Sequence, residues 1–310
     1  MAANPTLPTA TELFGAPKSQ WKEARKAVKK FARTKPFGFL GGLIVLFFIF
    51  CAIFPQALAQ FDPRELVGGR YDRVMTEAYD GFGGTYYLGT DDMGRDVFSR
   101  TVWGARVSIR VGIAAVLVGI TAGVLLGLTA GYLGGPFDMA TQRCVDAWMA
   151  FPGLILALFW VSMLDPGINT ITWAIAITLW PGASRVVRSS VLAIKQTTYV
   201  EAARAIGCTT PRILFRHILP NIVAIYVVLI SLSVGGAIIT EASLTFLGLG
   251  IEPDVATWGN LVFQGTRSLF LVGWWLPIAP SVCIALTVYG FNMFGDGLRD
   301  TLDPRLRGSK

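Results

Sequence analysis

Charge is scarce in this sequence. Only 15% of its 310 residues are charged, whereas 53% are hydrophobic. A soluble domain typically carries about 25% charged residues. The charged residues here are also clustered, so that long uncharged windows lie between them. This composition excludes a water-soluble protein and indicates a chain that crosses a membrane several times.

The side chains that most enzymes use are also scarce or scattered. His217 is the single histidine, and no Ser/His/Asp or Cys/His arrangement accompanies it. The four cysteines stand far apart and have no metal-ligand spacing. The dipeptide Gly-Lys does not occur, so the chain has no phosphate-binding loop for ATP. We therefore expect no catalytic residue, no bound metal and no cofactor in this chain.

Six uncharged windows predict six transmembrane helices and an all-α, polytopic membrane protein. In chain order, they fall near residues 37–58, 111–137, 147–164, 166–184, 218–240 and 268–295. Asp165 alone separates the third window from the fourth, which indicates a tight hairpin between these two helices.

The distribution of lysine and arginine predicts how the chain is oriented. Basic residues outnumber acidic ones in the leader, in the loop 185–217 and in the tail 296–310, but not in the loops 62–106 and 241–267. The positive-inside rule places the first three segments in the cytoplasm, and six spans give the same answer. We expect a multi-pass protein of the inner (plasma) membrane with both termini cytoplasmic. The net charge of +7 then reflects contact with anionic lipid, not nucleic acid.

Residues 18–35 predict an amphipathic basic helix. Trp21, Ala24, Val28 and Phe31 recur at helical spacing, and lysines and arginines fill most of the other positions. A helix of this kind lies in the surface of a membrane that contains acidic lipids. A charged helix surrounded by water is the alternative.

A glycine at every fourth position marks the second predicted span. The series consists of Gly119, Gly123, Gly127, Gly131 and Gly135. At 3.6 residues per turn, each step of four drifts by roughly 40° around the helix. The glycines therefore form a groove that winds around the helix and allows a second helix to approach closely within lipid. We favour packing within this chain, with a contact between subunits as the alternative.

The segment 199–221 is polar and mostly basic, and it separates two long apolar runs. Thr198 can cap a first short helix that carries Glu201 in its early turns. Gly207 can adopt the left-handed conformation that ends a helix. Thr210, followed by proline, can start a second helix. An ordinary helical loop between two spans is the alternative interpretation.

Two loops on the predicted outer side carry acidic residues. Asp91, Asp92 and Asp96 suggest a cation site, but their spacing does not match a calcium loop. We instead expect a surface helix capped by Thr90 or Asp91. In the second loop, Ala242–Ile251 is too short to span a membrane and predicts a re-entrant or interfacial segment. Glu241 precedes it at the expected membrane edge, where a carboxylate must be paired or hydrated.

Several of these stretches resemble the permeases of ABC importers. Glu201-Ala202-Ala203, Gly207 and the ending Ile218-Leu219-Pro220 are similar to the EAA loop of that family. The stretches beginning at Leu88, Glu241, Trp258 and Gly295 resemble segments of its dipeptide and oligopeptide branch. The resemblance as a whole extends from about residue 20 to 307. The sequence departs from the usual family pattern at His217, where a hydrophobic residue normally stands.

The resemblance implies one of two non-identical permease subunits of an ATP-driven importer. Its partners would be a second homologous permease, one or two ATPase subunits that bind ATP and Mg²⁺, and an extracytoplasmic substrate-binding protein. The ATPase-coupling residues would be Glu201, Ala202, Ala203, Arg204, Gly207 and Pro220. The chain itself would not be an enzyme, since its partners would hydrolyse ATP. Dipeptides or oligopeptides are the expected substrates, while relatives also carry nickel complexes, glutathione or oligosaccharides.

This interpretation divides the chain into five segments. They are a cytoplasmic leader with the basic helix (1–35), a first transmembrane helix (36–61), an external loop (62–106), a permease core with five transmembrane helices and the cytoplasmic EAA helix pair (107–300), and a cytoplasmic tail (301–310). The alternative is a self-sufficient secondary transporter or channel. Such a carrier usually keeps ionisable residues within its spans, and the sequence places Asp165 and Glu241 only at span ends.

Overall fold

Fifteen helical and strand elements make up the described part of the chain. The computed structural model describes residues 20–78, 83–267 and 275–302. In chain order the elements are α2 (Gln20–Thr34), α3 (Pro36–Ile53), η1 (Pro55–Ala57), β1 (Thr76–Glu77), β2 (Thr85–Tyr86), α4 (Val97–Leu133), α5 (Gly135–Met149), α6 (Gly153–Met163), α7 (Ile168–Ile194), α8 (Thr198–Ala205), α9 (Thr210–Ile213), η2 (Leu214–Ile218), α10 (Leu219–Phe246), α11 (Trp258–Arg267) and α12 (Trp275–Leu302). The antiparallel pair β1–β2 is a small exception to the predicted all-α fold.

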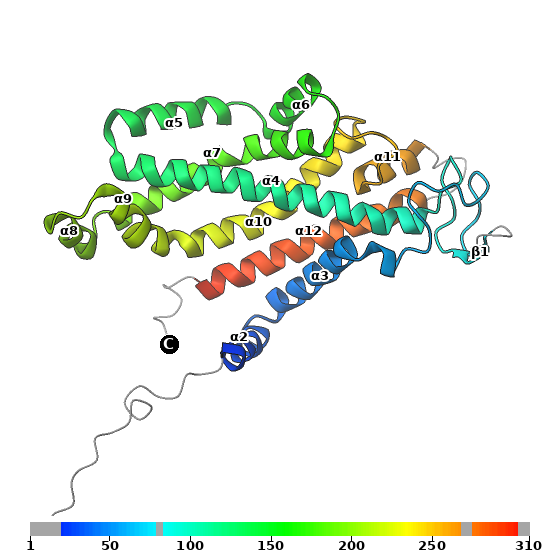
Figure 1. Ribbon diagram of the computed structural model, residues 1–310, viewed down its shortest axis with the longest axis horizontal. Helices are drawn as coiled ribbons and strands as arrows, with labels where there is room; N and C mark the ends of the chain where they lie inside the picture. Colours follow the sequence, from blue (N-terminus) through cyan, green and yellow to red (C-terminus); the bar gives the residue numbers. More distant parts are fainter. Residues whose placement is uncertain (1–19, 79–82, 268–274, 303–310) are drawn as a thin grey trace, which may run out of the picture.

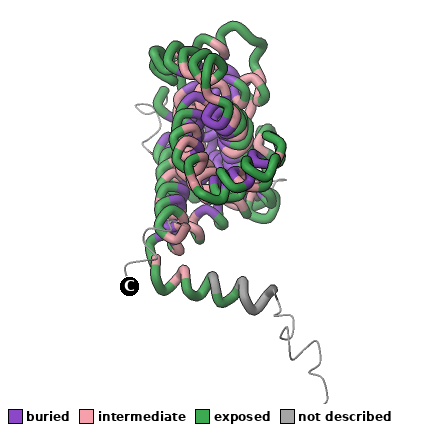
Figure 2. Tube along the Cα trace, turned by 90° about the vertical axis from the view of Figure 1, so that its left-hand side faces the viewer, coloured by how far each residue is buried: buried purple, intermediate pink, exposed green. Residues whose placement is uncertain are grey.

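The long helices α3, α4, α7, α10 and α12 run along one axis and form an elongated bundle (Figure 1). α4 packs along α7 and α10, while α12 packs between α3 and α10. Buried residues occupy the centre of the bundle and exposed residues surround it (Figure 2). Many exposed side chains are large and apolar, such as Phe37 and Leu46, which are 73% and 63% exposed. An apolar exterior of this kind suits a lipid environment.

The described residues contain four helices that are long and apolar enough to cross a membrane, or five if one bent pair counts as a span. The four are α3, α4, the continuous helix Thr210–Phe246, and α12. Six spans were predicted. The third predicted span, 147–164, is not a straight helix, because it covers parts of α5 and α6, which meet at a bend of 87° around Pro152. The fourth falls on α7, which contains Asn169, Pro181 and two arginines and is not among these candidates.

Helix starts and ends near the two acidic loops also differ from the predictions. α4 begins at Val97, capped by Asp96, whose carboxylate accepts a hydrogen bond from Ser99 N at 2.7 Å. No separate surface helix begins at Thr90 or Asp91 in this described segment, because the capped helix is the start of α4 itself. α10 continues to Phe246, so the first part of the predicted re-entrant segment is an extension of a long helix. The start of the sixth window, 268–274, lies outside the described residues.

The connecting segments gather at the two ends of the bundle. α8 and α9 lie at one end, and α2 and the end of α12 lie toward the same side (Figure 1). The loop that precedes α4 and helix α11 lie at the opposite end. This grouping is the one that six alternating spans would produce for the leader, the loop 185–217 and the tail. It leaves the predicted cytoplasmic location of these segments untested.

Candidate functional site

The segment 199–221, the predicted coupling loop, begins with a short helix where the sequence predicts one. Only the capping residue differs, by one position. α8 begins at Thr198, and the residue before it, Thr197, occupies the N-cap position in extended conformation. Its hydroxyl donates a hydrogen bond to the carbonyl of Ile194 and not to the new helix. Glu201 lies in the first turn of α8 and Arg204 in the last, an order that suits the helix dipole.

Gly207 ends α8 in the way that the sequence suggests. Its φ angle of +80° is in the left-handed region that favours glycine. The amide of Gly207 bonds to the carbonyl of Arg204 at 3.0 Å, and the amide of Cys208 bonds to that of Ala203 at 3.1 Å. This pair of bonds is a Schellman motif, which satisfies carbonyls that would otherwise be free at the helix end.

The second helix of the loop continues directly into the next long helix. Thr209 is the N-cap of α9, followed by Thr210 and a proline in the first turn. α9 leads into the π-helical turn η2, and Pro220 stands in the first turn of α10. The chain does not break at Pro220 in this described segment, because η2 and α10 follow one another without a gap. A π-helical turn is inserted before the proline, and π turns often occur at functional positions.

The loop is held on the bundle by an apolar inner face. Val200 and Ala203 of α8 are buried in the main hydrophobic core, as are Ile213, Leu214 and Ile218 of the second helical segment. Burying such side chains stabilises the attachment by about 1.5–3 kcal/mol for each large one. The loop is consequently packed against the bundle along its apolar face and is not a flexible connection between two helices.

The opposite face of the loop is open and partly apolar. Glu201, Ala202, Arg204 and Gly207 are all exposed. Large apolar side chains of the loop are exposed as well: Ile206 is 81% exposed, Phe215 58% and Tyr199 44%. We name these seven residues the outer face of the loop. Buried Ala203 and exposed Pro220 lie beside it and not within it.

Tyr132, near the end of α4, joins the loop to two long helices. Its ring lies 5.6 Å from Arg204 Cζ of α8 and 5.6 Å from Lys195 Nζ at the end of α7. Lys195 also donates a hydrogen bond to the Tyr132 carbonyl at 2.6 Å. Neither Tyr132 nor Lys195 is among the site residues that the sequence predicts. An aromatic residue one position after a glycine of the stripe, and a lysine just before the loop, were the available signals.

The glycine stripe of α4 faces α7 along its whole length. A Cβ atom on Gly119 would stand 2.5 Å from the carbonyl oxygen of Ala176, and one on Gly131 would stand 3.1 Å from that of Arg188. Gly123 and Gly127 meet the carbonyls of Trp180 and Ser184 in the same way. The partners on α7 also recur at every fourth residue. Gly135 is not part of this contact, because nothing lies within 4 Å of its Cβ position.

Two ion pairs fasten α5 to the other side of α7. Arg188 donates from Nε and Nη2 to the two carboxylate oxygens of Asp138, both at 2.6 Å. Arg185 Nη2 lies 2.5 Å from Asp146. The Arg188–Asp138 pair is bidentate, a geometry that fixes the orientation of the two groups as well as pairing their charges. α7 is thus held between α4 and α5 close to the coupling loop.

A buried charged cluster lies at the other end of the bundle. Asp91 accepts hydrogen bonds from the amide and from Nε of Arg95, at 3.0 and 2.8 Å. Arg100 is fully buried, with Nε 3.5 Å from the Asp91 carboxylate and Nη1 bonded to the carbonyl of Pro63. Asp96 is buried beside them, and this burial raises the pKa of its carboxyl, with hydrogen bonds from Ser99 opposing the shift. The cluster fixes the loop before α4.

The acidic residues of this region do not form a metal site. In residues 20–78, 83–267 and 275–302, no group of three His, Cys, Asp or Glu side chains could hold a metal ion. Glu241 lies in α10, completely buried, and is faced by the hydroxyls of Ser108 and Thr245. Of the two alternatives, paired or hydrated, these hydroxyls correspond to the paired one, and α10 extends beyond Glu241 to Phe246. Trp258 packs nearby and donates from Nε1 to the Thr101 carbonyl at 3.0 Å.

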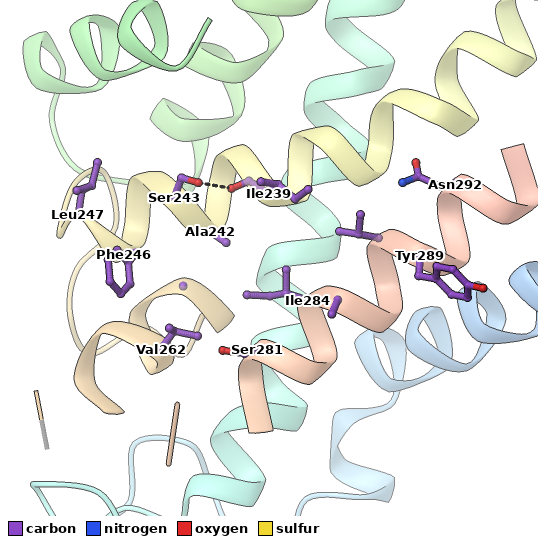
Figure 3. A pocket seen from close by; sticks show the side chains of 13 residues that line it. Ile239, Ala242, Ser243, Phe246, Leu247, Val262, Ser281, Ile284, Tyr289 and Asn292 are labelled. Atoms are coloured by element: carbon purple, nitrogen blue, oxygen red, sulfur yellow. Dashed lines mark hydrogen bonds between the residues drawn. The ribbon is translucent and has the colours of Figure 1, made fainter. Parts of the chain in front are cut away.

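A groove of about 680 Å³ lies between α10, α11 and α12 (Figure 3). Its walls are mostly apolar, with Ile239, Phe246 and Ile284 among the side chains that line it. Four polar side chains, Ser243, Ser281, Tyr289 and Asn292, are spaced along it. The Ser243 hydroxyl is bonded to the carbonyl of Ile239 at 2.8 Å. The groove is long and weakly polar, which suits passage or packing better than the tight binding of one small molecule.

The comparisons with known proteins agree with this geometry. Residues 123–308 match the family described as "Binding-protein-dependent transport system inner membrane component". The chain is 43% identical over 266 residues to the glutathione transport system permease protein GsiD of Pectobacterium atrosepticum, covering 86% of each chain. It is 39% identical over 276 residues to the protein of that name from Escherichia coli, covering 89% of each.

A solved structure has the same fold over part of the chain. It is titled "Inward facing conformations of the MetNI methionine ABC transporter". The superposition has a TM-score of 0.52 at 18% identity, and it covers 67% of this chain and 96% of the matched chain. At this level of identity the likeness concerns the fold.

Proposed function

The chain belongs to the family of inner-membrane components of binding-protein-dependent transport systems, and on this premise we propose that it is one of two permease subunits of an ATP-driven importer of small peptides. It is an integral permease of the inner membrane. In the proposal, it forms half of the translocation pore together with a second homologous permease. One or two ATPase subunits bind ATP and Mg²⁺ on one side, and a substrate-binding protein delivers substrate on the other.

The observation that carries the proposal is the outer face of the loop. This surface combines an acidic residue, a basic residue and three exposed apolar side chains: Glu201, Arg204, Tyr199, Ile206 and Phe215. Exposed apolar patches with a polar rim are typical of protein–protein contacts. The short helices α8 and α9 are held by buried residues behind this patch, so a partner that moves the patch also moves the bundle.

In the proposed mechanism, closure of the ATPase subunits on ATP displaces α8 and α9 as one body. The Tyr132 ring contacts Arg204 of α8 and Lys195 at the end of α7, and these cation–π contacts transmit the displacement to α4 and α7. The bundle then changes between an inward-facing and an outward-facing arrangement. ATP drives the change because it stabilises one arrangement more than the other. Glu201, Ala202 and Arg204 would contact the ATPase, while Gly207 and Pro220 would shape the two helices that do so.

Small peptides are the proposed substrates because of the relatives. The two relatives described above are named glutathione permeases, and glutathione is a tripeptide. The motifs of the dipeptide and oligopeptide branch lead to the same class. The groove between α10, α11 and α12 supports this choice, since its 680 Å³ is large enough for a short peptide and its polar side chains are well separated.

The test replaces Glu201 with arginine and measures both ATPase binding and uptake. We expect Glu201→Arg to yield a folded protein that retains less ATPase on co-purification and supports less ATP-dependent uptake of a labelled tripeptide. Glu65→Arg is the matched control, because Glu65 is also exposed but precedes α4 at the opposite end of the bundle. Normal ATPase recovery and uptake with Glu201→Arg would refute the coupling role. Uptake by the purified chain alone, without ATP, would favour a self-sufficient carrier.

A further inference from the structure

Helix α2 lies across the direction of the bundle. In Figure 1 it is seen almost end-on below α3, and in Figure 2 it runs across the view below the bundle. The chain turns at Lys35, whose backbone is not helical (φ −135°, ψ 70°), and α3 starts immediately with Pro36. If α3 crosses the membrane, α2 therefore lies close to the plane of the membrane surface, at the end of the span.

The end of α2 is fixed to α3 and α12. The ring of Phe31 occupies the space that Cβ atoms of Gly38 and Gly297 would need, at 3.1 and 2.9 Å. It also meets the ring of Phe294 edge-on, at 6.4 Å between centroids. Lys35 Nζ lies 2.6 Å from the carboxylate of Asp300. The angle between α2 and α3 is consequently held by contacts and does not depend on the short connection alone.

A groove of about 550 Å³ lies on the side of α2 that meets α3. Arg25, Lys26 and Lys29 line it together with Val28, Ala32 and Phe39. The three cations have no carboxylate partner among the side chains that the structure describes, which exclude 20–24 and 27. Val28 is 56% exposed in this groove. One surface thus joins three cationic side chains to an apolar floor.

The apolar floor continues along α3, away from the cations. Phe39 is followed at helical spacing by Leu43, Phe47 and Phe50, which share a face of α3. These three are 48%, 55% and 46% exposed. Below the charged groove, then, an apolar stripe runs in the direction of the span. A ligand with an anionic head and a long apolar tail would match both parts at once.

We propose that the angle between α2 and α3 is a binding site for one acidic phospholipid, such as phosphatidylglycerol. The phosphate lies among Arg25, Lys26 and Lys29, and an acyl chain runs past Phe39 along the exposed stripe of α3. A soluble acidic protein segment would use the cations but would leave the stripe uncovered. This site is independent of the ATPase-coupling loop, and a bound lipid would brace α2 against the bundle at the membrane surface.

The experiment measures lipid binding to the full-length protein, with any subunits that co-purify, by native mass spectrometry. The probes are phosphatidylglycerol and phosphatidylcholine with identical acyl chains. The groove variant is Arg25→Gln with Lys29→Gln. The matched control is Arg33→Gln with Lys30→Gln, which removes one arginine and one lysine from exposed positions of α2 that do not line the groove. Arg25→Lys with Lys29→Arg retains the charge and tests whether the fold tolerates substitution here.

We expect wild-type protein to prefer phosphatidylglycerol and the groove variant to bind it roughly thirtyfold more weakly, the effect of two lost cations near a lipid surface. The control pair and the charge-retaining pair should stay within about threefold of wild type. Equal losses in the groove and control pairs would mean diffuse attraction and would overturn the site. An absence of preference between the two lipids would overturn it as well. Displacement of the lipid by inorganic phosphate alone would show that the apolar stripe contributes nothing, which also contradicts the proposal.

Discussion

Replacing Gly119 with alanine should weaken the contact between α4 and α7, and the structure allows the size of the effect to be worked out. The new Cβ atom would stand 2.5 Å from the backbone oxygen of Ala176 and 3.0 Å from Cβ of Leu179. Protein Cβ atoms essentially never approach other heavy atoms closer than 3.0 Å, so the two helices must separate by at least 0.5 Å here. A backbone carbonyl inside a helix cannot rotate away to avoid the clash.

The cost follows from the loss of contacts along this helix pair. A gap of about 0.5–1 Å forfeits a quarter to a half of the attraction of the atoms concerned, and overpacked sites in proteins typically lose about 1–3 kcal/mol. Alanine recovers up to about 1 kcal/mol through its better helix propensity. We expect a net loss of about 1–2 kcal/mol for Gly119→Ala.

Two other glycines in the same helix pair provide a graded comparison. At Gly131 the nearest atoms to a Cβ would be 3.1 Å away, and at Gly182 of α7 nothing lies within 4 Å. Gly131→Ala should therefore cost less than Gly119→Ala. Gly182→Ala should leave stability unchanged or raise it by about 0.5–1 kcal/mol, because it gains helix propensity without a clash.

The assay is the apparent melting temperature of the detergent-solubilised protein, followed by tryptophan fluorescence at one fixed scan rate because unfolding of large proteins is often irreversible. A loss of 1 kcal/mol corresponds to about 2–4 °C in a protein of this size class. The expected order is Gly182→Ala highest, then wild type, Gly131→Ala and Gly119→Ala. If Gly119→Ala and Gly182→Ala have the same apparent melting temperature, the glycine stripe does not set the distance between α4 and α7, and the reasoning is refuted.

Three further predictions concern single side chains. Tyr132→Leu should remove two cation–π contacts of about 0.5–1 kcal/mol each and lower the uptake obtained per ATP hydrolysed. Tyr132→Phe retains the aromatic ring and should retain the wild-type ratio of uptake to ATP hydrolysis. An equal ratio in both variants would show that the contacts of Tyr132 with Arg204 and Lys195 do not transmit the motion. In a double-mutant cycle, Asp138→Asn and Arg188→Gln should show a coupling energy of about 1 kcal/mol. The control cycle, Asp138→Asn with Arg216→Gln, should show no coupling energy. Burial raises the pKa of the Asp96 carboxyl, so the folded protein binds this proton more tightly than the unfolded chain does, and the stability that Asp96 contributes falls as the pH rises from the usual aspartate range through the raised pKa. Asp96→Asn should remove this contribution to the pH dependence of the melting temperature while it retains the helix cap. Asp96→Ala should lose the cap and about 1 kcal/mol of stability.

Sequence reasoning located the features that depend on local chemistry. Gly207 was identified as a helix end because a left-handed position is costly for other residues, and its φ angle of +80° agrees. The spacing of the glycines on α4 predicted a close helix contact, although the sequence could not name α7 as the partner. The partner depends on which helices are neighbours, and that is decided by packing of the whole bundle.

Sequence reasoning failed where tertiary contacts override composition. The window 147–164 is apolar enough for a straight span, but the chain bends by 87° between α5 and α6. Arg185 and Arg188 were counted as part of a basic loop after the fourth window, whereas they lie within α7 and pair with Asp146 and Asp138 of α5. An arginine that bonds a carboxylate on a neighbouring helix can lie deeper than its charge alone suggests, and the sequence does not reveal the pairing.

The contacts between the loop and the bundle suggest why the stripe consists of glycine. Gly131 precedes Tyr132, so the last close contact of α4 with α7 lies directly beside the ring that Arg204 and Lys195 flank. Where helices meet through backbone atoms, there are no long side chains that can change rotamer and absorb a displacement. A force on α8 therefore moves α4 and α7 together. In the proposed mechanism, longer side chains in the stripe would allow the two helices to slip, and motion at the loop would be lost before it reached the opposite end of the bundle.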